Sequence, residues 1–304
     1  THDIPCWLPD GKSASGWLSM ANGIVDVSAL ARRIGGEEVD EAEIVRPHTH
    51  NFLSTFSLDY AYDAGAVCPM WDEYMFGVQP SPEMRDMLQM LMGLCLVPDC
   101  SYEVFFVLFG EGGCGKSVFM KTLANIVGKA NICTLPLSKF GEKHSAHLLT
   151  ESLVNIVGDL PTSDGSVSLH AIEGTLKDSV SGGLIACEKK NKEPYQAVAT
   201  ARHIFAANTL PSFADRTSGV WDRIRIVPFD VKFRGTDRQI VGLEKHLEKE
   251  LSGIFMWAVR GLAKLRALRA FPRGARGIEE EVRHRHSCDH EGQFLRDNYE
   301  LRNG

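Results

Sequence analysis

The stretch VFFVLFGEGGCGKS, residues 104–117, decides the fold class of this chain. Its first six residues, 104–109, are all apolar, which is typical of a strand buried on both faces of a parallel sheet. Residues 118–127 then place apolar side chains at helical spacing, and Gly128 is suited to end that helix. The stretch therefore predicts a strand, a glycine-rich loop and a helix in succession.

The loop fits the pattern G-x-x-x-x-G-K-S at every position, as Gly110-Glu111-Gly112-Gly113-Cys114-Gly115-Lys116-Ser117. Glycines let successive backbone N–H groups turn towards phosphate oxygens, and the following helix adds its positive N-terminal end. Lys116 is a cation for the β- and γ-phosphates, and Ser117 is a ligand for Mg²⁺. The loop therefore predicts a site for ATP and Mg²⁺, in preference to a glycine-rich turn with a surface lysine.

Two polar residues end other apolar runs of the chain. Asp159 follows residues 153–157 and is the predicted acidic partner of the loop, serving the metal and the attacking water. The alternative is an aspartate that caps a turn before Pro161, and Asp164 is a weaker candidate for the same role. Asn208 follows residues 203–207 and is predicted to orient the attacking water, although an asparagine in a turn is about equally supported by the local sequence.

Arg223 and Arg225 flank Ile224 at the start of a further apolar run. An arginine at a subunit boundary can reach the γ-phosphate of a neighbouring subunit and stabilise charge in the transition state. Either residue is also compatible with an ordinary arginine on an edge strand, and the local sequence does not choose between the two arginines.

The alternation of apolar runs with helical patterns predicts an α/β fold with a mostly parallel sheet. Helices are expected over 81–97, capped by Ser81, and from about 236 to 271, where Ile240 begins the apolar pattern. We divide the chain into an N-terminal accessory region of turns and short strands (1–78), a helical segment (79–101), the nucleotide-binding core (102–236) and a helical C-terminal region (237–304). Gly11-Lys12-Ser13 has no preceding apolar strand and is not expected to bind phosphate.

Composition excludes a disordered chain and makes an integral membrane protein unexpected. Of the 304 residues, 44% are hydrophobic and 24% charged, and no apolar run is long enough to span a bilayer. The eight cysteines form no C-x-x-C pair, so we expect reduced thiols and a cytoplasmic location, in a host cell if the protein is viral. The alternating His284, His286, Cys288 and His290 suit a solvated helix or loop better than a zinc site.

The net charge of −6 conceals an asymmetry along the chain. Residues 1–101 hold 15 acidic and 5 basic side chains, whereas residues 102–304 hold 24 acidic and 28 basic ones. The second part is therefore where an anionic partner is expected, with solvated charged faces as the alternative. The chain begins at Thr1, so we expect a fragment or a processed protein.

Several short segments follow one another in a recognisable order. They are ANGIVD at 21–26, YD and CPMW between 62 and 71, residues 177–183 followed by EKKNKEP at 188–194, ANTLP at 207–211, and residues 215–229. This order resembles superfamily 3 helicases, specifically the phage/plasmid and poxvirus-type primase-helicase family, from about Met20 to the C-terminus.

The resemblance implies an AAA+ ATPase that assembles into a ring, usually a hexamer, and moves 3′→5′ on single-stranded DNA. It implies that Arg223 takes the arginine-finger position and that Lys189, Lys190 and Lys192 lie on a hairpin that touches DNA in the central channel. Lysines in a turn can bind the phosphates of the DNA backbone without recognising the base sequence. The alternative is that these lysines form a solvated hairpin tip. A fused or associated primase is a further expected partner.

The chain departs from the family pattern at three positions. Cys114 stands where asparagine is common in the loop, Asp159 where the acid is often glutamate, and Asp222 where an arginine is often found. The shorter acid can still hold Mg²⁺. The basic residues between 260 and 285 fit either a path to a DNA-binding region or an ordinary helix surface.

These observations predict the ATP-dependent DNA helicase domain of a viral, phage or plasmid replication protein, without membrane partners. One alternative is a nucleotide-dependent DNA loader or switch that does not unwind DNA. A degenerate ring scaffold and a small-molecule kinase with a phosphate loop are further alternatives. The kinase would be a monomer that DNA does not stimulate, and the scaffold would not depend on Lys116.

Overall fold

A five-stranded parallel sheet forms the centre of the computed structural model, which describes residues 16–50, 52, 54, 57–142, 144–160, 169–210 and 218–288. The strand order is β10–β4–β9–β6–β5, so the strand that precedes the phosphate loop lies between two neighbours. The predicted α/β fold with a parallel sheet is confirmed. The strands are β4 (Phe105–Phe109), β5 (Ile132–Cys133), β6 (Val154–Val157), β9 (Arg202–Ala207) and β10 (Ile224–Pro228).

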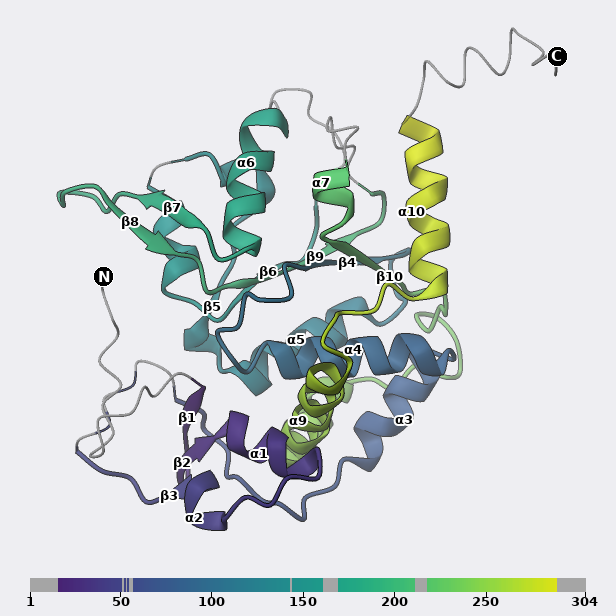
Figure 1. The fold of residues 1–304 in the computed structure, drawn as a ribbon. Coiled ribbons are helices and arrows are strands. Elements are labelled where there is room, and N and C mark those ends of the chain that lie inside the picture. Colours follow the sequence, from purple (N-terminus) through teal and green to yellow (C-terminus); the bar gives the residue numbers. More distant parts are fainter. Residues whose placement is uncertain are drawn as a thin grey trace, which may run out of the picture.

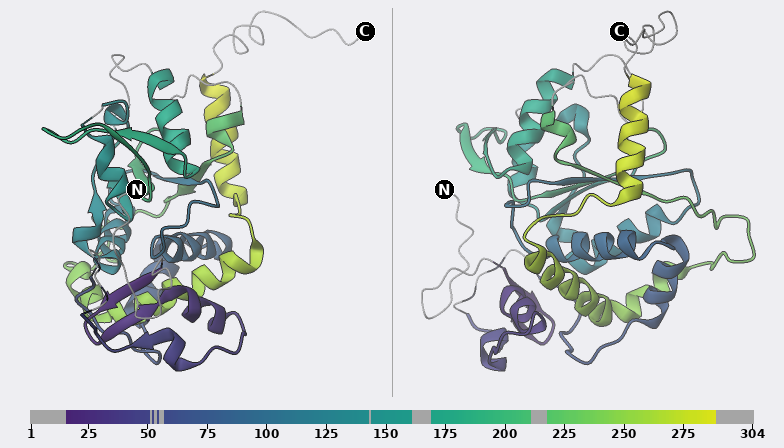
Figure 2. Two further views of the ribbon diagram at one scale, coloured as in Figure 1. Left: turned by 60° about the vertical axis from the view of Figure 1, so that its left-hand side comes forward. Right: turned by 45° about the vertical axis from the view of Figure 1, so that its right-hand side comes forward.

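Both faces of this sheet are covered by helices, as Figures 1 and 2 show. Within β4, Phe106 and Leu108 belong to the core on one face, and Phe105 and Val107 to the core on the other. This double burial explains why residues 104–109 are uniformly apolar rather than alternating. One face is covered by α4 (Pro82–Leu94), α5 (Lys116–Val127) and α9 (Leu251–Leu268), and the other by α6 (Leu169–Val180), α7 (Ser218–Trp221) and α10 (Ala275–Cys288).

Helix α4 begins where the sequence predicts but ends three residues early. The hydroxyl of Ser81 accepts a hydrogen bond from the Met84 N–H at 3.4 Å, and Pro82 occupies the first turn. The helix ends at Leu94, although Leu96 and Val97 remain buried beyond it. Apolar periodicity reports burial, and the core here extends past the last helical hydrogen bonds.

The helix predicted from 236 to 271 is wrong in its first part. Residues 229–242, which we call the β10–α8 segment, contain no described helix or strand, and Gly242 has a left-handed φ of 73°. Ile240 and Val241 are 49% and 85% exposed, so they do not continue the buried face of the following helices. The helical part consists of α8 (Leu243–Leu247), the 3₁₀ turn η4 (Glu248–Glu250) and α9.

The N-terminal region contains a small antiparallel sheet, as the predicted short strands require, together with two helices (Figure 1). The Asn22 amide accepts from the Tyr62 N–H and donates to the Tyr62 carbonyl, both at 2.8 Å, which joins two segments 40 residues apart. Gly11-Lys12-Ser13 lies outside the described residues. The elements are β1 (Trp17–Met20), β2 (Gly23–Asp26), β3 (Val45–Arg46), α1 (Val27–Ile34) and α2 (Glu41–Ile44).

Helix α3 (Pro69–Val78) joins the N-terminal region to α4 and packs against the phosphate-loop helix. The Trp71 ring lies 6.0 Å from Phe119 of α5 and 5.5 Å from Trp257 of α9, measured between ring centroids. A β-hairpin of β7 (Leu184–Cys187) and β8 (Tyr195–Val198) projects from the opposite side of the core (Figure 1). In the described part of the chain, no helix combines the length and hydropathy that a membrane crossing requires. Short 3₁₀ turns complete the fold at η1 (Lys129–Asn131), η2 (Leu137–Lys139) and η3 (Ala146–Thr150).

Candidate nucleotide-binding site

The phosphate loop occupies the turn between β4 and α5, as predicted. Gly113 and Gly115 have left-handed φ angles of 90° and 95°, which glycine adopts at no steric cost. A Cβ atom at Gly113 would come within 2.6 Å of the Arg234 Cβ, and one at Gly115 within 2.7 Å of the Val78 Cγ1. The glycines are therefore required both by the curl of the loop and by the close approach of two other segments.

Lys116 bends back over its own loop. Its Nζ donates to the carbonyls of Gly110 and Glu111, and to the Asn208 Oδ1 at 3.2 Å. Burial lowers the pKa of the ammonium group, and the nearby Asp159 carboxylate acts in the opposite direction. The cation is thus held in the loop by acceptors that an incoming phosphate group can replace.

Asp159 and Asn208 lie beside the loop because their strands end at the same edge of the sheet. Strand β9 pairs with β4 on one side and with β6 on the other, with Ala207 opposite Phe109 and Phe205 opposite Val157. Parallel strands present their carboxyl ends together, which is where ligands bind in open α/β sheets. Both residues line one cavity with Lys116 and Ser117 of the phosphate loop. The structure therefore brings together four predicted residues from three separate segments of the chain.

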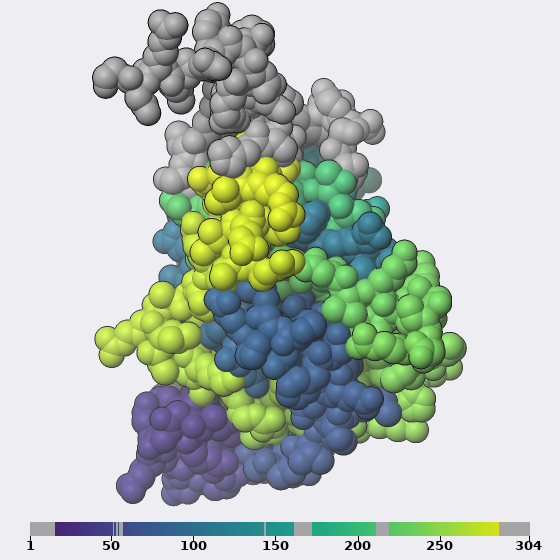
Figure 3. Space-filling model, turned by 90° about the vertical axis from the view of Figure 1, so that its right-hand side faces the viewer, coloured from purple at the N-terminus to yellow at the C-terminus, as the bar shows by residue number. Residues whose placement is uncertain are grey.

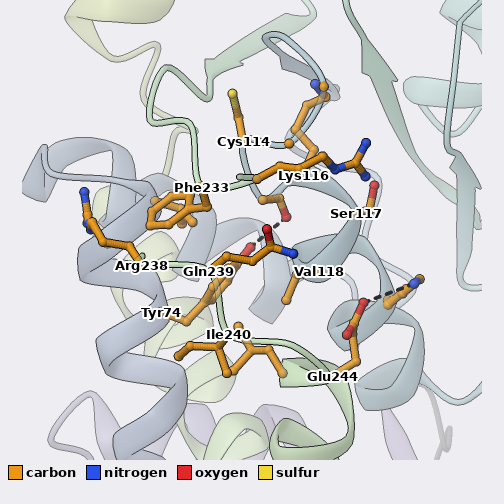
Figure 4. A pocket seen from close by; sticks show the side chains of 18 of the residues that line it. Tyr74, Cys114, Lys116, Ser117, Val118, Phe233, Arg238, Gln239, Ile240 and Glu244 are labelled. Atoms are coloured by element: carbon orange, nitrogen blue, oxygen red, sulfur yellow. Dashed lines mark hydrogen bonds and ion pairs between the residues drawn. The ribbon is translucent and has the colours of Figure 1, made fainter. Parts of the chain in front are cut away.

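This cavity has a volume of about 930 Å³, which is the size of a site for a nucleotide-sized ligand. Beyond the loop, its walls are formed by α3 and by the β10–α8 segment (Figure 4). The Tyr74 hydroxyl donates to the Gly115 carbonyl at 2.9 Å, and the backbone N–H groups of Phe233 and Arg234 donate to the Gly113 carbonyl at 3.0 and 3.3 Å. Both walls are therefore attached directly to the phosphate loop.

Sequence reasoning missed these two walls. Tyr74 follows the CPMW segment in α3 but belongs to no motif itself, and Arg234, Gln239 and Ile240 lie in a segment for which the sequence partly predicts a helix. The one available signal was Gly242, a residue that interrupts the expected helical run.

Neither candidate arginine reaches the cavity of its own chain. Arg223 precedes β10 at the end of the sheet opposite the phosphate loop, donates to the Gly219 carbonyl at 2.9 Å and pairs with Glu103 at 2.7 Å. Arg225 is buried and donates to backbone carbonyls of Asp222 and Ile224 at 2.8 Å, and burial lowers its pKa to about 10. These contacts give Arg225 a structural position, whereas the Arg223 side chain remains 25% exposed.

The three predicted DNA-contacting lysines lie in the turn between β7 and β8. Lys189 forms an ion pair with Glu151, while Lys190 and Lys192 are exposed. Asn191 between them adopts a left-handed φ of 62°. The hairpin predicted at this position is present, and contact with DNA stays a prediction.

The basic residues between 260 and 285 are largely engaged in contacts within the chain. Lys264 pairs with Asp86 at 2.7 Å and Arg273 with Asp222 at 3.1 Å, and Arg283 and Arg285 pair with glutamates one turn earlier in α10. This arrangement favours the helix-surface interpretation of this stretch.

The described cysteines and histidines provide no metal centre. Six cysteines are free thiols, at positions 68, 95, 100, 114, 133 and 187, and no cluster of three potential metal ligands occurs among the residues that the structure describes. His284 and His286 lie in α10, as expected for a helix, while His290 and the weaker acidic candidate Asp164 lie outside the described residues.

Comparison with known proteins finds a family and distant relatives for part of the chain. Residues 108–223, from the phosphate-loop strand to the residue before β10, match the family described as "Family of unknown function (DUF5906)". The chain is 26% identical over 160 residues to "Putative helicase L207/L206" of Acanthamoeba polyphaga mimivirus and 24% identical over 148 residues to "Putative helicase 121R" of Invertebrate iridescent virus 3. These matches cover 51% and 47% of the chain but only 16% of each relative.

The fold is similar to that of solved structures of the NrS-1 C terminal region. One apo structure superposes with a TM-score of 0.54 at 11% sequence identity, covering 75% of this chain and 53% of that one. A second gives a TM-score of 0.52 at 10% identity, covering 86% and 72%. At this identity the likeness concerns the fold, so the chain has the architecture of that region and is distantly similar in sequence to viral proteins named as helicases.

Proposed function

We propose that this chain is the ATP-hydrolysing core of a DNA helicase from a viral, phage or plasmid replication protein. The observation that carries this proposal is the meeting of Lys116, Ser117, Asp159 and Asn208 in one cavity at the carboxyl edge of the sheet. The distant similarity to two viral proteins named as helicases supports the reaction class.

The residues present fit a nucleoside triphosphate with Mg²⁺. Lys116 would exchange the carbonyls of Gly110 and Glu111 for phosphate oxygens, and the loop N–H groups and the start of α5 would receive the remaining negative charge. The Ser117 hydroxyl and the Asp159 carboxylate, both lining the cavity, would hold Mg²⁺, which neutralises charge on the β- and γ-phosphates when bound. The Asn208 amide would orient the attacking water.

A ring on single-stranded DNA is the assembly that this proposal requires. Arg223 lies at the opposite end of the sheet from its own phosphate loop, so it would serve the site of a neighbouring copy. The exposed Lys190 and Lys192 would contact the DNA backbone from a projecting hairpin.

The test combines ATP hydrolysis with strand displacement on one preparation. We expect hydrolysis that single-stranded DNA stimulates and displacement of a forked duplex, with both lost in Lys116→Ala. DNA-stimulated hydrolysis without displacement would instead favour a loader or switch, a role compatible with the short acid at Asp159. Hydrolysis unaffected by DNA in a stable monomer would contradict the proposal and favour a small-molecule kinase.

A further inference from the structure

The β10–α8 segment closes one side of the cavity and has no assigned role. Figure 3 shows it in green at the surface, beside α3 in blue. We propose that this segment is the second half of the nucleotide site: Arg234 binds the triphosphate at one end, and Ile240 and Val241 cover the nucleobase at the other. The inference rests on the proposed function, because it assigns the ligand of the same cavity in finer detail.

Arg234 is attached to the phosphate loop by its own backbone. Its N–H donates to the Gly113 carbonyl at 3.3 Å, and its Cβ leaves no room for a side chain at Gly113. The side chain lines the same cavity as Lys116 and Ser117. Among the residues that the structure describes, the guanidinium has neither an ion pair nor a hydrogen bond, and the residue is exposed.

The other arginine that lines the cavity, Arg238, lies over the Phe233 ring, 4.8 Å from its centroid. A guanidinium that is positioned by backbone contacts and lacks an acceptor suits a phosphate group, which it can bind through two parallel hydrogen bonds.

The opposite end of the cavity combines apolar side chains with the ion pair of Lys121 and Glu244. Figure 4 shows Tyr74, Val118 and Ile240 around the space that extends from Lys116 and Ser117. Val241, which is 85% exposed, and Ile240, which is 49% exposed, present apolar surface to this space without covering it. A cavity with cations at the phosphate loop and exposed apolar side chains at the other end fits a nucleoside triphosphate better than a free phosphate, because a planar base would cover these apolar side chains.

The segment is ordered by hydrogen bonds within itself. The Thr236 hydroxyl donates to the Phe233 carbonyl at 2.8 Å, and the Gly235 N–H donates to the Gln239 Oε1 at 2.9 Å. The Phe233 ring also lies against Gly77 of α3, where an added Cβ would be 3.5 Å from the ring. The spacing between Arg234 and Ile240 is thereby held, as a site with two distinct ends requires.

Calorimetric titration with two probes, ATPγS and inorganic tripolyphosphate, each with Mg²⁺, separates the two ends. We expect Arg234→Ala to weaken both probes about tenfold or more, since it removes a charge-assisted contact to phosphate. We expect the double variant Ile240→Ser/Val241→Ser to weaken ATPγS about tenfold and to change tripolyphosphate less than about twofold, since only ATPγS has a base.

Matched controls lie elsewhere on the surface. Arg260→Ala removes an exposed arginine of α9, and Leu268→Ser/Val282→Ser removes two exposed apolar side chains, 58% and 46% exposed, that do not line the cavity. Both controls should bind as the unmodified chain does. Melting temperatures of all variants report whether each one folds.

The outcomes distinguish this inference from the proposed function. An unmodified chain that binds neither probe contradicts the proposed function itself. If the unmodified chain binds the probes and the segment variants bind them equally well, the inference is wrong. It is also wrong if the double serine variant loses affinity for both probes alike. In either case the phosphate site itself is not contradicted. Photolabelling of the unmodified chain with 8-azido-ATP should mark peptides from the β10–α8 segment or α3, and labelling confined to other peptides would also overturn it.

Discussion

At the scale of the residue, buried polar side chains behind the nucleotide site satisfy one another through a chain of hydrogen bonds. The His203 ring in β9 contacts the Ser179 hydroxyl at 2.9 Å and the Asn155 amide of β6 at 3.4 Å. Asn155 also accepts from the Leu135 N–H at 2.7 Å and donates to the Leu135 carbonyl at 3.0 Å. Because β6 and β9 carry Asp159 and Asn208 at their ends, this network helps to hold the two site residues in register.

The network makes the stability of the chain depend on pH through His203. Burial lowers the pKa of this imidazole to about 3, while an unfolded chain has its usual value near 6.5. The unfolded state therefore binds an extra proton as the pH falls below about 6.5, and the folded state loses stability in that range. From pH 7 to pH 5 this one group should lower the free energy of unfolding by about 2 kcal/mol.

Urea unfolding at pH 7 and pH 5 measures this effect. The His203→Gln variant, whatever its stability at pH 7, should lose about 2 kcal/mol less than the unmodified chain between the two pH values. An equal loss in both proteins would show that other groups cause the pH dependence.

At the scale of the element, α4 and α9 cross at two glycines. A Cβ atom at Gly261 would lie 2.0 Å from the Gln89 carbonyl oxygen, and one at Gly93 would lie 2.3 Å from that of Ala258. The Gln89 amide then donates to the Trp257 carbonyl at 2.9 Å across the same contact. Close approach of the two backbones is what allows α9 to pack under the phosphate-loop helix.

Adding one methyl group at this crossing should separate the helices. We expect Gly261→Ala to destabilise the chain by about 1–3 kcal/mol, because the new atom overlaps backbone that cannot move freely. Gly174→Ala is the matched control, since Gly174 is exposed on α6 and a Cβ there meets no atom within 4 Å. That change should stabilise the chain by up to ~1 kcal/mol, and denaturation midpoints of the two variants should therefore move in opposite directions.

The β7–β8 hairpin allows a second test at this scale. If Lys190 and Lys192 contact DNA phosphates, the double alanine variant should reduce the salt dependence of single-strand binding, lowering the slope of log K against log salt by about 1.4. Lys189→Ala should have a smaller effect, because Lys189 already pairs with Glu151. Fluorescence anisotropy across a salt series provides the slopes, and an unchanged slope in the double variant would place the DNA contact elsewhere.

At the scale of the whole molecule, the length of the sheet separates the phosphate loop from Arg223. The phosphate loop follows β4 at one edge of the sheet, and Arg223 precedes β10 at the other, with Phe105 opposite Ile224 in the register. Five residues of strand span roughly 17 Å, so one chain cannot bring Arg223 to its own phosphate site without rebuilding the sheet. A contribution from Arg223 to hydrolysis therefore requires a second copy.

Mixing two inactive variants tests this requirement. Arg223→Ala should retain ATP binding and lower the rate of hydrolysis by about 10³-fold or more, and Lys116→Ala should abolish hydrolysis. A mixture should regain activity, because some interfaces then join an intact Lys116 from one copy to an intact Arg223 from the next. A mixture with no more activity than its components would contradict action in trans, and the melting temperature of Arg223→Ala excludes unfolding as the cause.

The strand, the phosphate loop and the helix at residues 104–127 could be predicted from local sequence alone, because the glycine spacing and the continuous apolar run are local features. Asp159 and Asn208 could also be predicted, since they lie two residues and one residue after apolar runs that form strands of the sheet. Their meeting beside Lys116 follows from strand order, which no local pattern records.

The residues that surround the loop follow from the packing of distant segments, which local sequence does not record. The Tyr74 hydroxyl and the Arg234 N–H donate to the carbonyls of Gly115 and Gly113 from segments far apart in the chain, and such contacts require no recognisable motif. Ile240 is a further example. Its spacing fits a helix, but the helix begins only after Gly242, and the Ile240 side chain lines the cavity instead. The spacing of apolar residues indicates which side chains should be shielded from water. Whether the protein core or a ligand shields them depends on how the chain packs.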